Sequence, residues 1–268
     1  MLHPSPARSL HLARPVAQGG VRGALRLLEF PFTVSQIKSR NQLEKKQVRA
    51  RIEQIGIIPV VRASSSREAC VAAEAVNKGG IPIVEITMTV PGAIEVIREL
   101  AKTSGSEVLI GAGTVLNAED ARRCLDAGAQ FLVSPGFNRA TIEFAARESK
   151  LILAGALTPT EIIEAWTAGS DFVKVFPCGQ VGGAKYIKAL KGPLPQIPLV
   201  PTGGVNLNTA AEFIEAGAAA LGIGGELVQA EALKSNKPEL IVETARKFLE
   251  IVATARAKLA GVAARGSA

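Results

Sequence analysis

The sequence predicts a parallel (β/α)8 barrel, also called a TIM barrel, with an N-terminal helix and a C-terminal helical extension. Between about residues 56 and 228, short apolar runs alternate with amphipathic helical patterns, and eight such units follow one another through short connections. A doubly wound sheet is the alternative architecture. It would be expected to carry a glycine-rich dinucleotide turn after the first strand, but residues 61–64 read Val-Arg-Ala-Ser.

The predicted strands are short, apolar and bounded by turn residues. They cover residues 57–61, 83–88, 108–115, 131–135, 151–157, 172–177, 199–203 and 220–224.

The predicted helices lie between these strands and carry recognisable ends. They cover residues 66–78, 92–102, 118–127, 139–149, 159–168, 184–190 and 208–216, with a less regular segment after residue 227. Two of them begin at N-cap signals, Asn117 and Thr158. Several end at a glycine, as a left-handed C-cap requires. These glycines are Gly79, Gly128, Gly169 and Gly217.

The net charge of +7 is concentrated at the N-terminus. Residues 1–40 contain six basic residues and one acid, Glu29, a net of +5, which leaves +2 for residues 41–268. With one Tyr and one Trp, the chain lacks the aromatic residues that would stack on bases, so we expect no nucleic-acid partner. The basic start indicates an organelle-targeting segment over residues 1–34, with a disordered tail as the alternative. The first case predicts a plastid or another organelle, and the second predicts the cytoplasm.

The rest of the chain is expected to form one domain over residues 35–259. A charged helix is predicted over about residues 35–54, and apolar residues recur at helical spacing over residues 238–259. The last residues, 260–268, are expected to form a frayed tail. No apolar run reaches the ~18 residues of a membrane span, so no membrane partner is expected.

The residue inventory excludes several kinds of site. Cys70, Cys124 and Cys178 show no CxxC spacing, which gives no metal signature and no disulfide framework. His3 and His11 are the only histidines, so the predicted barrel has neither a catalytic histidine nor a histidine-rich metal site.

One lysine lies in the middle of the predicted strand at residues 172–177. Because side chains alternate across a strand, Phe172, Lys174 and Phe176 point to one side. An ammonium group between two phenyl rings loses hydration, which disfavours its charged form. A neutral amine attacks carbonyl carbons, so the functional interpretation is a lysine that forms a Schiff base. The structural alternative is a lysine that reaches solvent or pairs with Asp171.

Glu85 is a second charged residue expected inside the barrel. Such barrels carry their function at the carboxyl ends of the strands. Glu85 and Thr87 alternate with Val84 and Ile86 on the second strand, so the carboxylate faces the interior. Since even-numbered strands share interior layers, we expect Glu85 to lie near Lys174 of the sixth strand. A buried ion pair that only stabilises the fold is the alternative. We favour proton transfer, because titratable groups in a cleft mark active sites.

Glycine pairs follow the last two predicted strands. Thr202, Gly203 and Gly204 end the seventh strand, and Gly224 and Gly225 end the eighth. In barrels these two loops often bind phosphate through backbone N–H groups. Their position favours a phosphorylated ligand.

Five motifs, in this order, resemble those of the KDPG/KHG aldolase family. They are residues 84–87 (Val-Glu-Ile-Thr), 111–116 (Gly-Ala-Gly-Thr-Val-Leu), 134–136 (Ser-Pro-Gly), 172–177 (Phe-Val-Lys-Val-Phe-Pro) and 201–205 (Pro-Thr-Gly-Gly-Val). Members are class I aldolases that act on 2-keto-3-deoxy-6-phosphogluconate (KDPG) and 4-hydroxy-2-oxoglutarate (KHG). The resemblance extends over about residues 56–228, and the motifs are specific only when taken together.

The resemblance implies a homotrimer of barrels, a small-molecule 2-keto acid substrate, and a mechanism without a metal or organic cofactor. It implies that Lys174 forms the Schiff base with the 2-keto group and that Glu85 transfers protons as general acid and base. The resemblance and the strand ends together give the residues expected to bind the substrate. They are Arg62, Thr87, Thr114, Pro135, Phe176, Thr202, Gly203, Gly204, Gly224 and Gly225.

Two positions depart from the family pattern. Thr89 stands where some members have an arginine that holds the substrate carboxylate, and Glu226 stands where many have a serine near the phosphate. A carboxylate repels a phosphate dianion. The substrate is therefore expected to be KDPG, cleaved to pyruvate and glyceraldehyde 3-phosphate, or a related 4-hydroxy-2-oxo acid that gives pyruvate and a glyoxylate-type aldehyde. The alternatives are a non-catalytic ligand-binding barrel and an isomerase-type phosphate-binding barrel.

Overall fold

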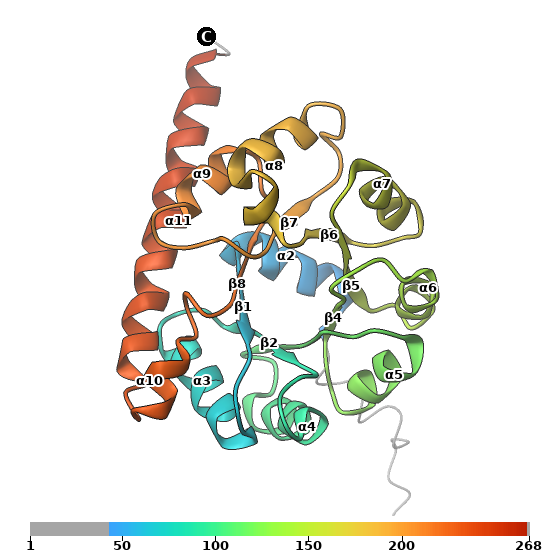
Figure 1. Cartoon of the computed structure of the whole chain (residues 1–268), viewed down its shortest axis with the longest axis vertical. Coiled ribbons are helices and arrows are strands. Elements are labelled where there is room, and N and C mark those ends of the chain that lie inside the picture. The colour runs from blue at the N-terminus through green and yellow to red at the C-terminus, as the bar shows by residue number, and fades with distance from the viewer. Residues whose placement is uncertain (1–42, 267–268) are drawn as a thin grey trace, which may run out of the picture.

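Eight parallel strands form a barrel with helices around it in the computed structural model, which describes residues 43–266 (Figure 1). The strands run in chain order from β1 to β7, and β8 pairs with β1. β7 is joined to the β8 segment by one isolated bridge, between Thr202 and Gly222, and by a hydrogen bond of 2.9 Å from the Ala219 N–H group to the carbonyl oxygen of Leu199. The predicted barrel is thereby confirmed, and the β7–β8 junction, called the seam below, is its thinnest connection. The predicted targeting segment, residues 1–34, lies outside the described residues.

The strands begin where the sequence predicts, to within one residue, and most of them end earlier. Their bounds are β1 (Ile57–Val61), β2 (Ile83–Thr87), β3 (Leu109–Gly113), β4 (Phe131–Val133), β5 (Leu151–Ala156), β6 (Phe172–Val175), β7 (Leu199–Pro201) and β8 (Leu221–Ile223). Residues such as Pro135, Phe176 and Gly203 thus leave the strand ladder and line the rim, where a barrel carries its functional groups.

The helices alternate with the strands as predicted. They are α3 (Ser66–Lys78), α4 (Ala93–Ser104), α5 (Ala118–Asp126), α6 (Arg139–Arg147), α7 (Pro159–Thr167), α8 (Gly183–Lys191), α9 (Ala210–Glu215) and α10 (Ala230–Lys234), with a 3-10 turn η1 (Cys178–Val181) after β6. The predicted N-caps form: Asn117 accepts a hydrogen bond from the backbone of Asp120, and Thr158 makes a capping box with Glu161.

One predicted C-cap has the predicted position but not the predicted left-handed conformation. Gly128, Gly169 and Gly217 have the expected positive φ angles, whereas Gly79 has a φ of −74° and the following Gly80 takes the left-handed conformation, with a φ of 96°. The reason for a glycine at position 79 is packing. A Cβ atom there would overlap the side chain of Ala245 on the C-terminal helix.

Helix α2 (Lys45–Ile55) lies across the N-terminal end of the barrel (Figure 1). Lys45 Nζ lies 2.9 Å from a carboxylate oxygen of Asp171. The guanidinium carbon of Arg49 lies 5.2 Å from the centre of the Phe172 ring, within cation–π distance. Asp171, the alternative partner of Lys174, thus pairs with α2 at the closed end. The predicted helix was to begin near residue 35; residues 35–42 lie outside the described part.

Helix α11 (Glu239–Gly266) runs along the outside of the barrel past α9 and α3 (Figure 1). Ile241, Phe248 and Val252 are buried on its inner face. The helix continues beyond Leu259 to Gly266, so the prediction of a frayed tail over residues 260–268 is wrong for residues 260–266. Among the described residues, no helix combines the length and apolar character needed to cross a membrane.

Candidate active site

Lys174 and Glu85 meet inside the barrel. Lys174 Nζ lies 3.8 Å from Glu85 Oε1, and the two side chains are 5% and 2% exposed. They come from β6 and β2, the two even-numbered strands that the sequence placed near one another. The structure therefore brings the two predicted catalytic residues to one point of the interior.

Glycines on the neighbouring strand make room for the carboxyl group. Glu85 pairs with Gly111 in the β2–β3 ladder, and Thr87 pairs with Gly113. A Cβ atom on Gly113 would overlap the carboxyl group of Glu85, and one on Gly111 would overlap the ring of Phe131. Any larger residue at position 113 would therefore displace Glu85.

Burial raises the pKa of Glu85, because an ionised carboxylate is poorly solvated there. The positive charges of Lys174 and Arg62 lower the pKa, but they offset the effect of burial only in part, so the pKa remains above its ordinary value. Glu85 Oε1 is buried and has no hydrogen-bond partner among the described residues. A buried carboxyl group with one unpaired oxygen can hold a proton and release it to a reacting atom.

Phe176 lies beside the lysine at the rim. Lys174 Nζ is 5.5 Å from the centre of the Phe176 ring, and this side chain is partly buried. Phe172, the second predicted neighbour, is fully buried, and its ring is covered by Arg49 of α2. The aromatic contact at the open end is thus made by Phe176.

Thr87 connects two strands. Its hydroxyl group donates a hydrogen bond of 3.0 Å to the carbonyl oxygen of Val61 at the end of β1. It also lies 2.7 Å from the hydroxyl group of Thr89. Since Thr87 has a single proton, which goes to Val61, Thr89 donates in the second bond. Thr87 is fully buried and exposed Thr89 lies above it.

Thr114 and Pro135 lie at the rim on the loops after β3 and β4, and both are partly buried. Thr114 has a φ of 59°, the left-handed region that β-branched residues rarely occupy. Such strain is typical of functional positions. A Cβ atom on Gly155 would overlap the backbone of Pro135, which explains the glycine on β5 beside Lys174.

Arg62 follows β1 and is exposed. Its guanidinium group reaches toward the loop after β8, since Nη1 lies 3.4 Å from the point that a Cβ atom on Gly224 would occupy. Its charge also reaches Glu85, as its effect on the Glu85 pKa shows. Arg62 thus lies between the acid and the glycine-rich loops.

The loop after β7 packs backbone against backbone on η1, the turn after β6. Gly203 and Gly204 have φ angles of 81° and 84°. The N–H group of Gly179 donates a hydrogen bond of 2.8 Å to the carbonyl oxygen of Gly203. A Cβ atom on Gly204 would clash with Gly179, which leaves no room for a side chain. Thr202 is buried at the bridge to Gly222.

The loop after β8 is more open. A Cβ atom on Gly225 would meet no atom within 4 Å, so this position has no steric need for glycine. Gly224 is partly buried, and Gly225 and Glu226 are exposed. The loop that is expected to bind a phosphate thus carries an exposed carboxylate, that of Glu226, directly after its glycine pair.

Sequence reasoning missed the roles of Gly113 and Gly179. Gly113 accommodates the carboxyl group of Glu85, and Gly179 packs under Gly204. The pairing of β2 with β3 was the available signal, because a glycine beside an inward charged residue indicates space for that residue. Between residues 43 and 262, no group of three or more His, Cys, Asp or Glu residues could hold a metal ion.

A family model described as "KDPG and KHG aldolase" matches residues 48–244. The chain belongs to this aldolase family. A 2-dehydro-3-deoxy-phosphogluconate aldolase from Treponema pallidum is 35% identical over 202 residues, which cover 75% of this chain and 95% of the relative.

Two solved structures are similar to this chain. The KDPG aldolase of Legionella pneumophila, with pyruvate captured at low pH as a covalent carbinolamine intermediate, has a TM-score of 0.69 and 32% identity. The match covers 74% of this chain and 96% of that chain. A cube-shaped protein cage designed by fusing symmetric oligomeric domains has a TM-score of 0.74 and 30% identity, covering 80% of this chain and 78% of that one.

Proposed function

We propose that the protein is a class I aldolase that cleaves KDPG, or a related 4-hydroxy-2-oxo acid, through a Schiff base on Lys174. The observation that carries the proposal is the buried pair of Lys174 and Glu85, with Nζ and Oε1 3.8 Å apart. Family membership and a relative that binds pyruvate covalently support the same chemistry.

The reaction follows from these two groups. Lys174 Nζ attacks the C2 ketone, and loss of water from the carbinolamine gives a protonated imine. Loss of the C4 hydroxyl proton then breaks the C3–C4 bond, and the bond electrons move into the imine to form an enamine. The aldehyde leaves. Protonation of the enamine at C3 and hydrolysis of the imine release pyruvate and restore the amine.

Glu85 is proposed as the group that moves these protons. Its raised pKa allows it to carry a proton in the folded enzyme, and its unpaired Oε1 lies on the side of Lys174. A water molecule between Glu85 and the substrate would complete the relay.

The remaining rim residues are proposed to bind the substrate. Thr114, Pro135 and Phe176 surround the pyruvyl end, with Thr87 at the end of β2 and Thr89 just after it. Arg62 supplies positive charge between this end and the seam. The distal end of the substrate is proposed to lie on the glycine-rich loops, which consist of Thr202, Gly203, Gly204, Gly224 and Gly225.

Borohydride trapping tests the mechanism. Pyruvate and borohydride should add a stable mass to the peptide that contains Lys174, and Lys174→Met should abolish both labelling and cleavage. Lys188→Met on α8, an exposed lysine outside the barrel, is the control. An unlabelled Lys174 in a fully active enzyme would contradict the proposal. Pyruvate binding without cleavage of any substrate would support a non-catalytic barrel instead.

The identity of the aldehyde product is tested with a panel of substrates. KDPG, its dephosphorylated analogue and KHG should be compared by kcat/KM. If exposed Glu226 faces the phosphate, Glu226→Ser should improve KDPG cleavage and leave the unphosphorylated substrate unaffected, because it removes a like charge.

A homotrimer is also proposed, on the resemblance and on the similarity to symmetric oligomeric domains in a designed cage. Large apolar side chains such as Leu116, Ile163 and Leu207 are exposed in the single chain, which is consistent with a partner surface. Light scattering with size-exclusion chromatography measures the assembly directly.

We also propose the bounds of the catalytic domain and the localisation of the protein. The catalytic domain is proposed to span residues 35–259, and the first 34 residues to act as a transit peptide to a plastid or another organelle. The aldolases from Treponema pallidum and Legionella pneumophila are bacterial enzymes, and without targeting the protein would remain in the cytoplasm. A fluorescent protein fused to residues 1–34 would distinguish the two localisations, because it would enter an organelle in the first case and stay in the cytoplasm in the second.

A further inference from the structure

We propose that Arg256 of α11 is a positioning residue that holds β8, and with it the ligand loops of the seam, in register. The proposal rests on the proposed aldolase function for its kinetic readout. Arg256 lies beyond residues 48–244, the part of the chain that the family model matches. It therefore belongs to the C-terminal extension of this chain.

Arg256 joins the two segments that enter β8 and β1. Its Nη1 donates a hydrogen bond of 2.7 Å to the carbonyl oxygen of Gln54, at the end of α2. Its Nη2 donates one of 3.3 Å to the carbonyl oxygen of Ala219, two residues before β8. Gly56 lies against the guanidinium group, and a Cβ atom there would overlap it. One side chain thus satisfies carbonyl groups at the start of both strands.

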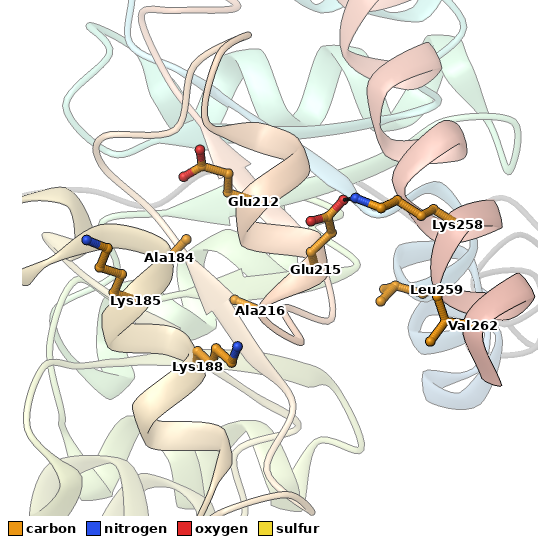
Figure 2. A pocket seen from close by; sticks show the side chains of 9 residues that line it. All are labelled: Ala184, Lys185, Lys188, Glu212, Glu215, Ala216, Lys258, Leu259 and Val262. Atoms are coloured by element: carbon orange, nitrogen blue, oxygen red, sulfur yellow. Dashed lines mark hydrogen bonds and ion pairs between the residues drawn. The ribbon is translucent and has the colours of Figure 1, made fainter. Parts of the chain in front are cut away.

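The same helix is attached to the element that leads into β8. Lys258 Nζ lies 2.7 Å from Oε1 of Glu215, the last residue of α9 (Figure 2). Ala245 packs against Gly79 of α3 on the other side. On the outer surface of the barrel, helix α11 therefore contacts α9 and α3, the two helices next to the paired strands β8 and β1.

These contacts matter because β8 has fewer hydrogen bonds on its β7 side than on its β1 side. Its ladder to β1 joins residues 221–223 to residues 57–59, whereas its links to β7 are the isolated Thr202–Gly222 bridge and one hydrogen bond of 2.9 Å from the Ala219 N–H group to the carbonyl oxygen of Leu199. Ala219 and Gly224 are five residues apart, about 17 Å of extended strand. A shift of β8 along its axis would move Gly222 away from Thr202 and Gly224 away from Arg62.

Lys174 and Glu85 should not follow such a shift. Lys174 lies on β6, which pairs with β5 and β7, and Glu85 lies on β2, which pairs with β1 and β3. Each of these strands is held by a ladder on both sides. Loss of Arg256 should therefore weaken binding of the distal end of the substrate and leave the chemistry of the pyruvyl end intact.

The test compares Arg256→Met with Arg246→Met, an exposed arginine on the same helix. Cleavage of KDPG reports on the whole site, whereas exchange of pyruvate methyl protons with deuterium requires only the Schiff base and the acid. For Arg256→Met we expect KM for KDPG to rise about tenfold, the loss of roughly one charge-assisted hydrogen bond, with kcat and pyruvate exchange within about threefold. Arg246→Met should match the wild type.

Amide hydrogen exchange provides a readout that needs no activity. Arg256→Met should speed exchange in peptides covering residues 199–208 and 219–229, and leave peptides covering residues 83–90 and 172–177 unchanged. If Arg256→Met does not fold, Arg256→Gln, which keeps an amide donor, takes its place.

Two results would overturn the inference. One is an unchanged KM together with unchanged exchange at the seam. The other is a parallel loss of cleavage and pyruvate exchange with faster amide exchange throughout, which indicates general destabilisation. A wild-type protein that shows neither reaction would instead contradict the proposed aldolase function, and amide exchange would still decide the role of Arg256.

Discussion

The two sides of the barrel support the site in different ways. Lys174 and Glu85 lie on β6 and β2, and each of these strands has a ladder with both of its neighbours. The proposed ligand loops lie at the seam, where one isolated bridge and one further hydrogen bond join β7 to the β8 segment and the outer helix α11 supplies contacts. The strands that carry Lys174 and Glu85 are held by hydrogen-bond ladders within the sheet, whereas the seam is also supported by contacts from the outer helix α11.

The difference separates chemistry from recognition. Proton transfer and imine formation need atoms fixed to within about 0.5 Å, which a fully paired sheet provides. Loops that bind the distal end of a substrate need only present N–H groups and charge. The contrast predicts that substitutions on the paired side lower kcat, whereas substitutions at the seam raise KM.

The largest effect is expected for Lys174→Met. It removes the proposed nucleophile from a strand that pairs with both of its neighbours, so cleavage should fall by on the order of 10⁴-fold or more with little change in fold. Initial rates and far-UV circular dichroism measure the two quantities. Residual activity near the wild-type level would show that the paired side does not carry the chemistry.

Glu85→Gln should rank second. Loss of a positioned acid and base should lower kcat by about 10²–10⁴-fold, while borohydride trapping of pyruvate on Lys174 persists at a slower rate. Mass spectrometry of the trapped enzyme checks this. Equal loss of trapping and of cleavage to background would mean that Glu85 acts by holding Lys174 rather than by moving protons.

Gly113→Ala tests how closely the paired side is packed. The added methyl group would overlap the Glu85 carboxyl group, so we expect a loss of about 1–3 kcal/mol in the free energy of unfolding together with lower kcat. Gly136→Ala is a matched control, since a Cβ atom there meets no atom within 4 Å. Urea denaturation and initial rates of both variants measure the contrast.

Glu85→Gln should also change the pH dependence of stability. Burial raises the pKa of Glu85 in the folded protein, so the folded state binds more protons than the unfolded state at pH values between the unfolded and the folded pKa. Glu85 therefore lowers stability as pH rises. The stability of Glu85→Gln minus that of the wild type should therefore be more favourable at pH 8 than at pH 5. Thermal melts of both proteins at the two pH values would measure this difference. An equal difference at both pH values would mean that the carboxyl group titrates normally.

The smallest effect is expected for Lys258→Met. Its ion pair with Glu215 is largely exposed, with side chains 65% and 36% accessible, so the loss should be below about 1 kcal/mol. KM for KDPG should change less than in Arg256→Met. A larger effect from Lys258 than from Arg256 would assign the external support of the seam to α9 instead.

Periodicity alone carried most of the fold prediction. The strand starts and the positions of Lys174 and Glu85 follow from alternation and from apolar runs, because a parallel barrel repeats one local pattern. The strand ends were less accurate, since residues at the rim, such as Pro135 and Phe176, keep the composition of a strand after the ladder has stopped.

The contacts that depend on distant packing could not be predicted. Arg49 over Phe172 and Arg256 against Gly56 join residues far apart in the chain, and an arginine on a helix gives no sign of its partner. Gly79 was predicted as a left-handed helix end. It does end α3, but with a φ of −74°, and the close approach of α11 explains why a glycine stands there. The helical character of residues 260–266 was missed because small residues were taken as a frayed end.

Helix α2 closes the N-terminal end of the barrel. Lys45 and Arg49 attach α2 to the start of β6, and Phe131 and Phe172 are fully buried on the inward faces of their strands. Because α2 covers this end, we expect substrate and products to pass the opposite rim. In the proposed reaction, pyruvate is still bound covalently to Lys174 when the aldehyde is released. Departure of the two fragments is therefore sequential, the aldehyde first and pyruvate second, and accumulated pyruvate should occupy Lys174 and compete with incoming substrate.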